Sequence, residues 1–370
     1  MQRQTQAIEE ADLIPGLADD VAMECLLRVA GSSHPHMQAV CRRWERVIKS
    51  PEFYEERRRA GTLSPYICMV QAFPEPTCSM EADKDMAMPG FGLSMFDPKQ
   101  GSWEWLPQIP DFPQGLPLFS QCLALEAKLF VVGGWNPSTY EAMTSIYIFN
   151  FCTRQWKRGR DMLEARSFFG CGVLNGQILV AGGHDEDKNA LATAEVYLPE
   201  EDRWERLPQM SEERDECFGV VLNAKFYAIS GYATEMQGQF VRSTDVYDPA
   251  TGCWIRTEEF LMADIFPSAY TVAGGQLYAF RRQELLLYNC EDGTWESIDC
   301  LPYDGKVAAC SAAGGDKLVI SGLTASQKGH SWMHLYKPNR KHGAGHGQWQ
   351  LLQDTVKFRG VVTASCTVKI

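Results

Sequence analysis

Two histidine pairs have the spacing of zinc ligands and are the first candidates for chemistry in this sequence. His330 and His334 lie four residues apart, and so do His342 and His346. A zinc site built on such a pair needs a helix, which brings both rings to one face. Pro338 and the glycines after it favour strand and loop instead, and no Cys-x-x-Cys pair accompanies the histidines. We therefore predict no metal site and no cofactor.

Other catalytic patterns are also missing or incomplete. The glycines at 170, 172 and 176 miss the dinucleotide-binding spacing by one residue and open no helix. The sequence has no Gly-x-Ser-x-Gly elbow and no phosphate-binding loop that ends in Gly-Lys-Ser/Thr. The cysteines of three apolar stretches are expected to be buried and inert, and these are Cys122, Cys171 and Cys310. We predict no catalytic residue, and hence a protein that is not an enzyme.

Composition and charge narrow the class of partner. The chain has 370 residues, 45% of them apolar, and a formal net charge of −12. Residues 1–60 hold 9 Lys/Arg and 10 Asp/Glu, so almost all of the negative charge belongs to the remainder. An acidic body repels phosphate backbones and anionic lipid, which excludes nucleic acid and membrane as partners. The polar start has no signal-peptide core, and we expect a cytoplasmic and/or nuclear protein with reduced thiols.

A helical domain is predicted over residues 12–61, after a flexible N-terminus at 1–11. The first helix places Ala22, Leu26 and Val29 on one face, and Gly31-Ser32-Ser33 ends it. A second helix begins near Pro35 and a third at Ser50-Pro51. The apolar stripe of the second helix consists of Met37, Val40, Cys41, Trp44 and Ile48. Three short helices make a meagre core, so the domain needs to dock on its own body or on a partner.

From residue 62 onward the helical period disappears and a repeat begins. Tryptophans recur at 105, 156, 204, 254, 295 and 349, and a glycine pair or single glycine follows an apolar strand in most units. A period near 50 residues is typical of an array of identical supersecondary units. The first unit lacks a first strand, whereas residues 358–370 resemble one. We therefore predict a six-bladed ring over 62–370, whose first blade is completed by the C-terminal strand.

Both parts resemble known modules. The helical segment, through Leu17-Ala18-Asp19-Asp20-Val21, Glu24-Cys25-Leu26 and Val40-Cys41-Arg42-Arg43-Trp44, resembles an F-box, the module that docks on the adaptor Skp1 in cullin-RING ubiquitin ligases. The repeat resembles the kelch repeat. The resemblance implies a mainly β fold, a six-bladed kelch β-propeller preceded by a small three-helix F-box. It also implies that a set of F-box residues divides between the module's core and its Skp1-facing surface: Leu17, Val21, Cys25, Leu26, Val40, Cys41 and Trp44. Where the family usually has proline, this chain has Ala18.

The loops of the propeller indicate where a target would bind. Turns between first and second strands are tight, whereas the loops after the glycine pairs are long and share one end of the blades with the blade-to-blade connections. Aromatic residues and arginines are typical of interface hot spots. The predicted target-binding residues are Trp135, Tyr140, Arg166, His184, Asp185, Arg214, Tyr232, Phe240 and Arg242. For Arg166 and Arg214 the alternative is that they only tie one blade to the next through backbone carbonyls.

The resemblance to plant kelch F-box proteins implies the substrate-recognition subunit of an SCF (Skp1-cullin-F-box) E3 ubiquitin ligase. The F-box would bind Skp1, and through it cullin, and the propeller would hold a target for ubiquitination and proteasomal degradation. Targets in that group include phenylalanine ammonia-lyase, which controls phenylpropanoid flux, and cytokinin-response regulators, and we rank the former first. The alternatives are a propeller enzyme and a scaffold that works without a cullin.

Overall fold

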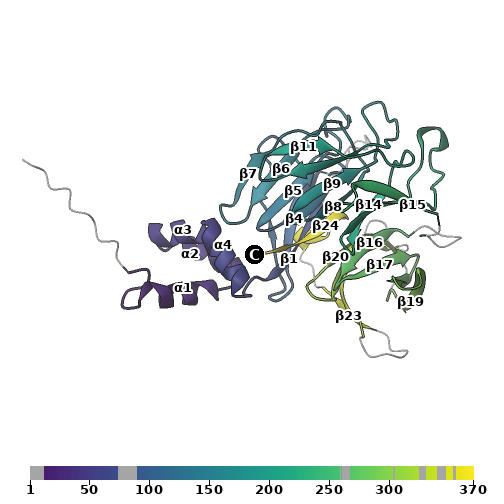
Figure 1. The fold of residues 1–370 in the computed structure, drawn as a ribbon. Helices are drawn as coiled ribbons and strands as arrows, with labels where there is room; N and C mark the ends of the chain where they lie inside the picture. The colour runs from purple at the N-terminus through teal and green to yellow at the C-terminus, as the bar shows by residue number, and fades with distance from the viewer. Residues whose placement is uncertain are drawn as a thin grey trace, which may run out of the picture. The chain divides into compact units, whose positions relative to one another are not determined.

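The computed structural model describes residues 12–73, 90–258, 260, 267–302, 305–324, 331–339, 347–352 and 356–370 (Figure 1). The chain divides into two compact units. The helical unit consists of 1–64 with 151–153 and 369–370, and the propeller consists of 65–150 and 154–368. The flexible N-terminus predicted for residues 1–11, and the candidate ligands His330, His342 and His346, lie outside the described residues.

The described part of the helical unit holds four α-helices and a short 3-10 turn. These are α1 (Asp19–Leu27), η1 (Gly31–Ser33), α2 (His34–Gln38), α3 (Arg42–Ile48) and α4 (Pro51–Arg59). The start of α4 follows its sequence signals, since the Ser50 hydroxyl accepts a hydrogen bond from the Phe53 amide at 3.2 Å and Pro51 occupies the first turn. Three arginines in the last turn of α4 face the negative end of its dipole.

The predicted second helix is in fact two helices, which corrects the count from three to four. Cys41 has an extended backbone (φ −160°, ψ 162°), and its thiol accepts a hydrogen bond from the Trp44 amide, so that it caps α3 instead of continuing α2. The apolar spacing of residues 37–48 fits one continuous stripe, and it carried no sign of this break. The chain turns between Ala39 and Cys41 as a result, and Val40 lies in the turn.

In the described residues, twenty-four strands form six four-stranded antiparallel sheets (Figure 1). Blade 1 contains β24 (Val362–Lys369), β1 (Pro65–Ala72), β2 (Phe91–Asp97) and β3 (Ser102–Trp105), and blade 2 contains β4 (Gln121–Leu125), β5 (Lys128–Val132), β6 (Ile146–Asn150) and β7 (Gln155–Arg158). Blade 3 contains β8 (Gly170–Leu174), β9 (Gln177–Ala181), β10 (Ala194–Leu198) and β11 (Arg203–Arg206), and blade 4 contains β12 (Phe218–Leu222), β13 (Lys225–Ile229), β14 (Thr244–Asp248) and β15 (Cys253–Thr257). Blade 5 contains β16 (Ala269–Ala273), β17 (Gln276–Arg281), β18 (Glu284–Asn289) and β19 (Thr294–Cys300), and blade 6 contains β20 (Gly305–Ala312), β21 (Leu318–Thr324), β22 (Ser331–Lys337) and β23 (Gln348–Leu351). Two further short turns are η2 (Thr234–Met236) and η3 (Val356–Phe358).

The C-terminal strand closes the ring, as predicted. Strand β24 is the first strand of blade 1 and is hydrogen-bonded to β1, which follows it in the sheet although it lies near the other end of the sequence. The Ala72 amide donates to the Val361 carbonyl at 2.9 Å, and the Gln71 side chain donates to the carbonyls of Phe358 and Gly360. A Cβ atom at Gly360 would lie 1.8 Å from the Ala72 carbonyl oxygen, so only glycine allows this approach.

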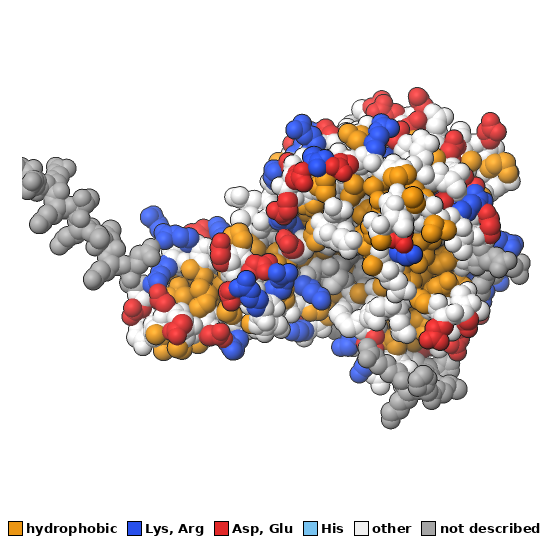
Figure 2. All heavy atoms as spheres, in the orientation of Figure 1, with side chains coloured by type: hydrophobic (Ala, Val, Ile, Leu, Met, Phe, Trp, Pro, Cys, Tyr) orange, Lys and Arg blue, Asp and Glu red, His pale blue; other side chains and the backbone are white. Residues whose placement is uncertain are grey.

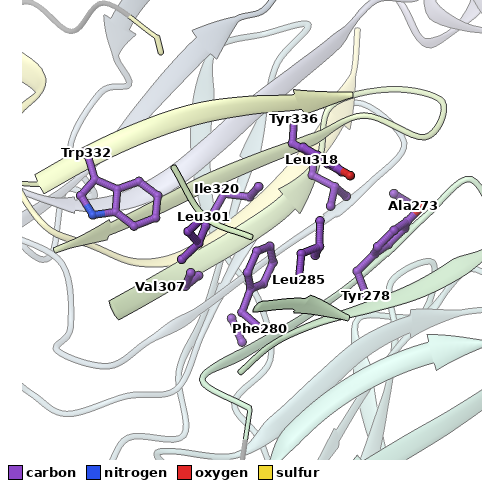
Figure 3. Packing of buried hydrophobic residues seen from close by; sticks show 11 residues of the cluster. Ala273, Tyr278, Phe280, Leu285, Leu301, Val307, Leu318, Ile320, Trp332 and Tyr336 are labelled. Atoms are coloured by element: carbon purple, nitrogen blue, oxygen red, sulfur yellow. The ribbon is translucent and has the colours of Figure 1, made fainter. Parts of the chain in front are cut away.

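The repeated tryptophans hold the blades to the connections between them. The indole N–H groups of Trp156, Trp204 and Trp254 donate to the carbonyls of Pro107, Arg160 and Pro208, each in the segment that enters the blade of that tryptophan. Apolar side chains fill the remaining space between neighbouring sheets. Figure 3 shows one such cluster, in which Phe280 and Leu285 of blade 5 pack with Ile320 of blade 6. The body is therefore a series of sheets that bury their faces against each other.

Candidate binding surfaces of the two units

The helical unit leaves several of its predicted Skp1-facing side chains exposed. Leu17, Val21 and Val40 expose 38%, 48% and 62% of their surface, and Cys25 and Cys41 are exposed as well. Figure 2 shows hydrophobic side chains gathered on the helical unit between acidic and basic ones. Exposed large apolar side chains on so small a unit are typical of a surface that a partner covers.

Two of the predicted residues belong to the core of the unit instead. Leu26 is buried, and Trp44 is half-buried and donates its indole N–H to the Leu13 carbonyl at 2.6 Å. Because Val21 and Cys25 are four residues apart on α1, they share a face, and Leu26 lies on the buried side of the same helix. The predicted set thus divides into five exposed residues and two that support them.

A buried arginine joins the helices of this unit. Arg57 of α4 donates to the carbonyls of Leu27 and Thr62 at 3.1 and 3.0 Å, and its Nη1 lies 3.0 Å from Nε2 of His34. Burial, together with the positive charge of Arg57, lowers the pKa of His34 to about 4. The ring is therefore neutral near pH 7, and Nε2 accepts from the guanidinium.

On the propeller, the predicted loop face is built by a repeating backbone contact. The blade-to-blade connection pairs with the residue after each glycine pair or, in blade 4, after Ser230-Gly231, and the bridges join Leu118 to Trp135, Ser167 to His184, and Asp215 to Tyr232. In each bridge the two residues are 17 positions apart in the sequence. The loops 133–145, 182–193 and 230–243 therefore leave blades 2, 3 and 4 from equivalent positions. We call the surface that they form with the connections the loop face.

His184 lies at the centre of a hydrogen-bond network that spans three blades. Its Nδ1 is 3.0 Å from both carboxylate oxygens of Asp215, and its Nε2 lies 2.9 Å from the Ser167 hydroxyl and 3.2 Å from the indole nitrogen of Trp135. Ser167 and Asp215 were not among the predicted residues. The constant spacing of 17 residues was a signal that could have found them, because it places both directly opposite predicted positions.

The distances of this network match a Ser-His-Asp triad, but its environment does not. The Ser167 side chain is fully buried, so a substrate in solvent has no path to its hydroxyl in this conformation. Nε2 of His184 also accepts from Trp135, so the serine is not its sole partner. We interpret the network as a structural one, whose hydrogen bonds hold the loops and connections of the loop face in place. The neighbouring Tyr232 donates to Glu216 at 3.0 Å, and burial together with the Asp215 charge raises the pKa of Tyr232.

Arg166 and Arg214 are interior residues, which corrects the prediction that they contact a target directly. Both side chains are fully buried. Arg166 donates to the Gly182 carbonyl at 2.8 Å and to Glu195 at 2.7 Å. Arg214 makes the equivalent contacts with Ser230 and Asp245. The guanidinium bonds to the Gly182 and Ser230 carbonyls are the contacts with backbone carbonyls that were the alternative. The backbone carbonyl of each arginine also accepts from a glycine amide of the preceding blade.

The remaining predicted residues differ in exposure. Tyr140 is half exposed and Arg242 is exposed, whereas Trp135, Asp185 and Phe240 are partly buried. His184 and Tyr232 are buried beneath them, and the Phe240 ring meets Tyr232 edge-on at 5.2 Å. Five of the nine predicted residues are thus open to solvent on the loop face.

A cavity of about 450 Å³ lies between the innermost strands of the propeller. Cys122, Cys171 and Cys310 line it, as expected for inner-strand cysteines, but only Cys122 is buried, and Cys171 and Cys310 are partly exposed to the cavity. Desolvation raises the pKa of Cys171 and Cys310, so that both stay protonated. Among the described residues, no group of three or more His, Cys, Asp or Glu side chains is arranged to hold a metal ion. No helix in the described ranges is long and apolar enough to cross a bilayer.

Six four-stranded sheets around a cavity, closed by the last strand of the chain, define a β-propeller protein that carries a helical unit. Residues 122–163 and 165–211 match the Kelch motif. The chain is 38% identical to F-box/kelch-repeat protein At1g80440 of Arabidopsis thaliana over 79% of this chain and 83% of that protein. It is 34% identical to F-box/kelch-repeat protein At1g15670 of the same plant, over 97% and 100%. It is also 31% identical to F-box/kelch-repeat protein SKIP20, over 89% and 94%. The chain belongs to the F-box/kelch-repeat proteins.

Proposed function

We propose that this chain is the substrate-recognition subunit of an SCF E3 ubiquitin ligase. The helical unit binds a Skp1-like adaptor and through it a cullin, and the loop face holds a protein for ubiquitination. The chain positions its target and performs no chemistry of its own, since tethering raises the effective concentration of a target lysine at the ligase. The protein then acts in the cytoplasm and/or the nucleus, where its partners are.

The observation that carries this proposal is the exposed apolar surface of the helical unit. Leu17, Val21 and Val40 are three of the eight large hydrophobic side chains exposed among the described residues, although the unit is a small part of the chain. Membership of the F-box/kelch-repeat proteins, whose name includes the F-box, supports an adaptor as the partner that covers them.

The adaptor interface is tested with two classes of variant in the full chain. Val21→Glu with Val40→Glu places charges on exposed positions, and we expect it to abolish co-purification of Skp1 and cullin while the melting curve stays unchanged. Leu26→Ala is the matched control, because it weakens the core by about 2–5 kcal/mol without altering the exposed residues. Full adaptor binding by the double variant would contradict the proposal.

For the target we propose phenylalanine ammonia-lyase first, and hence control of phenylpropanoid flux, with cytokinin-response regulators as the second candidate. The support is the resemblance to the plant kelch F-box group. Proximity labelling with the wild-type chain, with and without a proteasome inhibitor, tests this ranking. We expect the wild-type chain to label phenylalanine ammonia-lyase more strongly when the proteasome is inhibited. A Tyr140→Ala, Arg242→Ala double variant should label it weakly, both with and without the inhibitor. Labelling of other proteins alone would reject this target.

A further inference from the structure

Four aromatic rings meet on the loop face where blades 2 and 3 adjoin. We call Phe119, Trp135, Phe168 and His184 the ring cluster. The centroids of Phe119 and Phe168 are 4.5 Å apart, those of Phe119 and Trp135 are 5.1 Å apart, and Phe168 lies 5.4 Å from His184. His184 is buried, whereas the other three rings are only partly buried and present part of their surface to solvent.

The backbone holds two of these rings in a conformation that bulky residues avoid. Phe119 and Phe168 have φ values of 57° and 53°, and Glu216 occupies the equivalent position of blade 4 with φ 52°. A left-handed conformation costs a bulky residue about 1–2 kcal/mol, and strain of this kind concentrates where the placement of a side chain matters for function. The result is a row of two rings followed by an exposed carboxylate along three consecutive blades.

The charge around the ring cluster is negative. The loops 133–145, 182–193 and 230–243 contain five carboxylates but only two basic side chains, Lys188 and Arg242. Arg166 and Arg214 do not offset this charge at the surface, because both are buried against carboxylates. A basic segment of a target would thus meet a complementary potential.

The chain itself shows what the ring cluster accepts. The Lys188 ammonium group lies over the Trp135 ring, 5.6 Å from its centroid, which is the geometry of a cation–π interaction. Lys188 is on an exposed loop, with φ 63°. Because Lys188 is on an exposed loop, a cationic side chain of another protein can displace its ammonium group from the Trp135 ring.

We propose that the loop face recognises a basic segment of the target, with an arginine or lysine side chain stacked on Trp135, Phe119 and Phe168 and paired with Glu216. Lys188 occupies the same aromatic surface in the free chain and competes with the target. This inference rests on the proposed function, since it specifies the chemistry of the segment that the loop face holds. The negative charge of the propeller repels nucleic acid, and on the loop face the same charge favours a cationic segment of a protein partner.

The test measures binding of labelled nona-arginine to the purified full-length chain at fixed salt, with nona-citrulline as a neutral isostere and nona-glutamate as the opposite charge. We expect nona-arginine to bind at least about tenfold more tightly than the other two. Trp135→Leu and Glu216→Gln should each weaken binding by about three- to tenfold, as expected for one cation–π contact or one charge pair. Lys188→Ala should strengthen the binding of nona-arginine, because it frees the Trp135 ring and removes one positive charge from the loop face.

Glu296→Gln is the matched control, because it removes the same charge from an exposed position on β19, away from the loop face. Equal losses in Glu216→Gln and Glu296→Gln would show unspecific attraction and overturn the inference, as would preferential binding of nona-glutamate. Unchanged thermal melting of Glu216→Gln and Lys188→Ala keeps folding separate from binding. If these variants leave nona-arginine binding unchanged while Tyr140→Ala, Arg242→Ala still abolishes target labelling, the basic-segment inference fails and the proposed function stands.

Discussion

The helical unit and the propeller both contain buried arginines that join neighbouring segments by hydrogen bonds, but the arginines of the two units have different partners. Arg57 binds backbone carbonyls and a neutral histidine within a core of a few apolar residues. Arg166 and Arg214 are each paired with a buried carboxylate and occupy equivalent positions before blades 3 and 4. The helical unit is left with exposed apolar side chains, whereas the propeller closes on itself through β24. On the proposed function, the helical unit is completed by a partner, whereas the propeller is completed by its own C-terminal strand.

The largest effect on stability is expected from removal of the C-terminal strand, which closes the propeller. Deletion of residues 359–370 exposes the edge of β1 and opens the cavity between the innermost strands, so we expect loss of the cooperative melting transition, an effect as large as the ~5–15 kcal/mol that stabilises a typical domain. Circular dichroism and limited proteolysis measure it. Lys369→Ala, at an exposed position of β24, is the control and should melt like the wild type. A truncated chain that melts like the intact one would show that the ring does not depend on closure.

A smaller but still large effect is expected from one arginine of the propeller. Arg214→Ala leaves the buried Asp245 carboxylate without a counter-ion, with only the Ser211 hydrogen bonds remaining, and should cost about 3–5 kcal/mol in the free energy of unfolding. The exposed Arg242→Ala should change stability by less than about 0.5 kcal/mol. Denaturant titration of both variants gives the two values. Similar values would mean that the tie between blades contributes little.

The third prediction concerns acid and the helical unit. Because the pKa of His34 is lowered to about 4, the unfolded chain takes up a proton near pH 6.5 while the folded unit does not. Stability should therefore be complete above pH 6.5 and fall progressively between about pH 6.5 and 4. Hydrogen exchange in α1 and α4, corrected for intrinsic rates, should show this loss in the wild type and a flatter profile in His34→Gln.

The matched control for that profile lies in the other unit. Burial likewise lowers the pKa of His334 on β22 to about 4. His334→Gln should flatten the acid response of blade 6 and leave that of α1 and α4 as in the wild type. If His34→Gln does not alter the pH dependence of the helical unit, its acid sensitivity arises from another group.

The smallest effect is expected at Ala18, where the resemblance to the F-box implies a proline. Ala18 precedes α1 with φ −60° and ψ 143°, and its side chain makes no capping hydrogen bond. Proline adopts this φ without strain, so Ala18→Pro should stabilise the helical unit by about 0.4–1 kcal/mol by restricting the unfolded chain. Ala18→Gly should act in the opposite direction. Adaptor affinity and hydrogen exchange in α1 measure both, and a destabilised proline variant would show that the turn needs the Ala18 amide.

Much of the architecture could be predicted because it repeats. The tryptophan period, the glycine pairs and the resemblance of residues 358–370 to a first strand were enough for six blades and their closure. The break at Cys41 was hidden, since Met37, Val40 and Trp44 keep the spacing of one helix. A capping thiol leaves no periodic signal, and its effect depends on local backbone geometry.

The candidate site was harder to predict because its contacts cross blades. Loop lengths located the loop face, but the exposure of each residue depends on which partners the neighbouring blade supplies. Arg166 fits a hot-spot pattern in sequence and is nevertheless buried, because its guanidinium binds Glu195 of blade 3 while its backbone carbonyl accepts from Gly134 of blade 2. Phe119 and Phe168 were overlooked because nothing in a single sequence shows that their backbone is left-handed.

Pairing β24 with β1 has a consequence for synthesis. The ribosome makes β1 hundreds of residues before β24, so blade 1 waits for its first strand until β24 has left the exit tunnel. The helical unit emerges hundreds of residues sooner and can fold while the ring is still open. On the proposed function, a stop codon before β24 would then yield a product whose helical unit can bind the adaptor while its propeller stays open, and this product would occupy the adaptor without presenting a target.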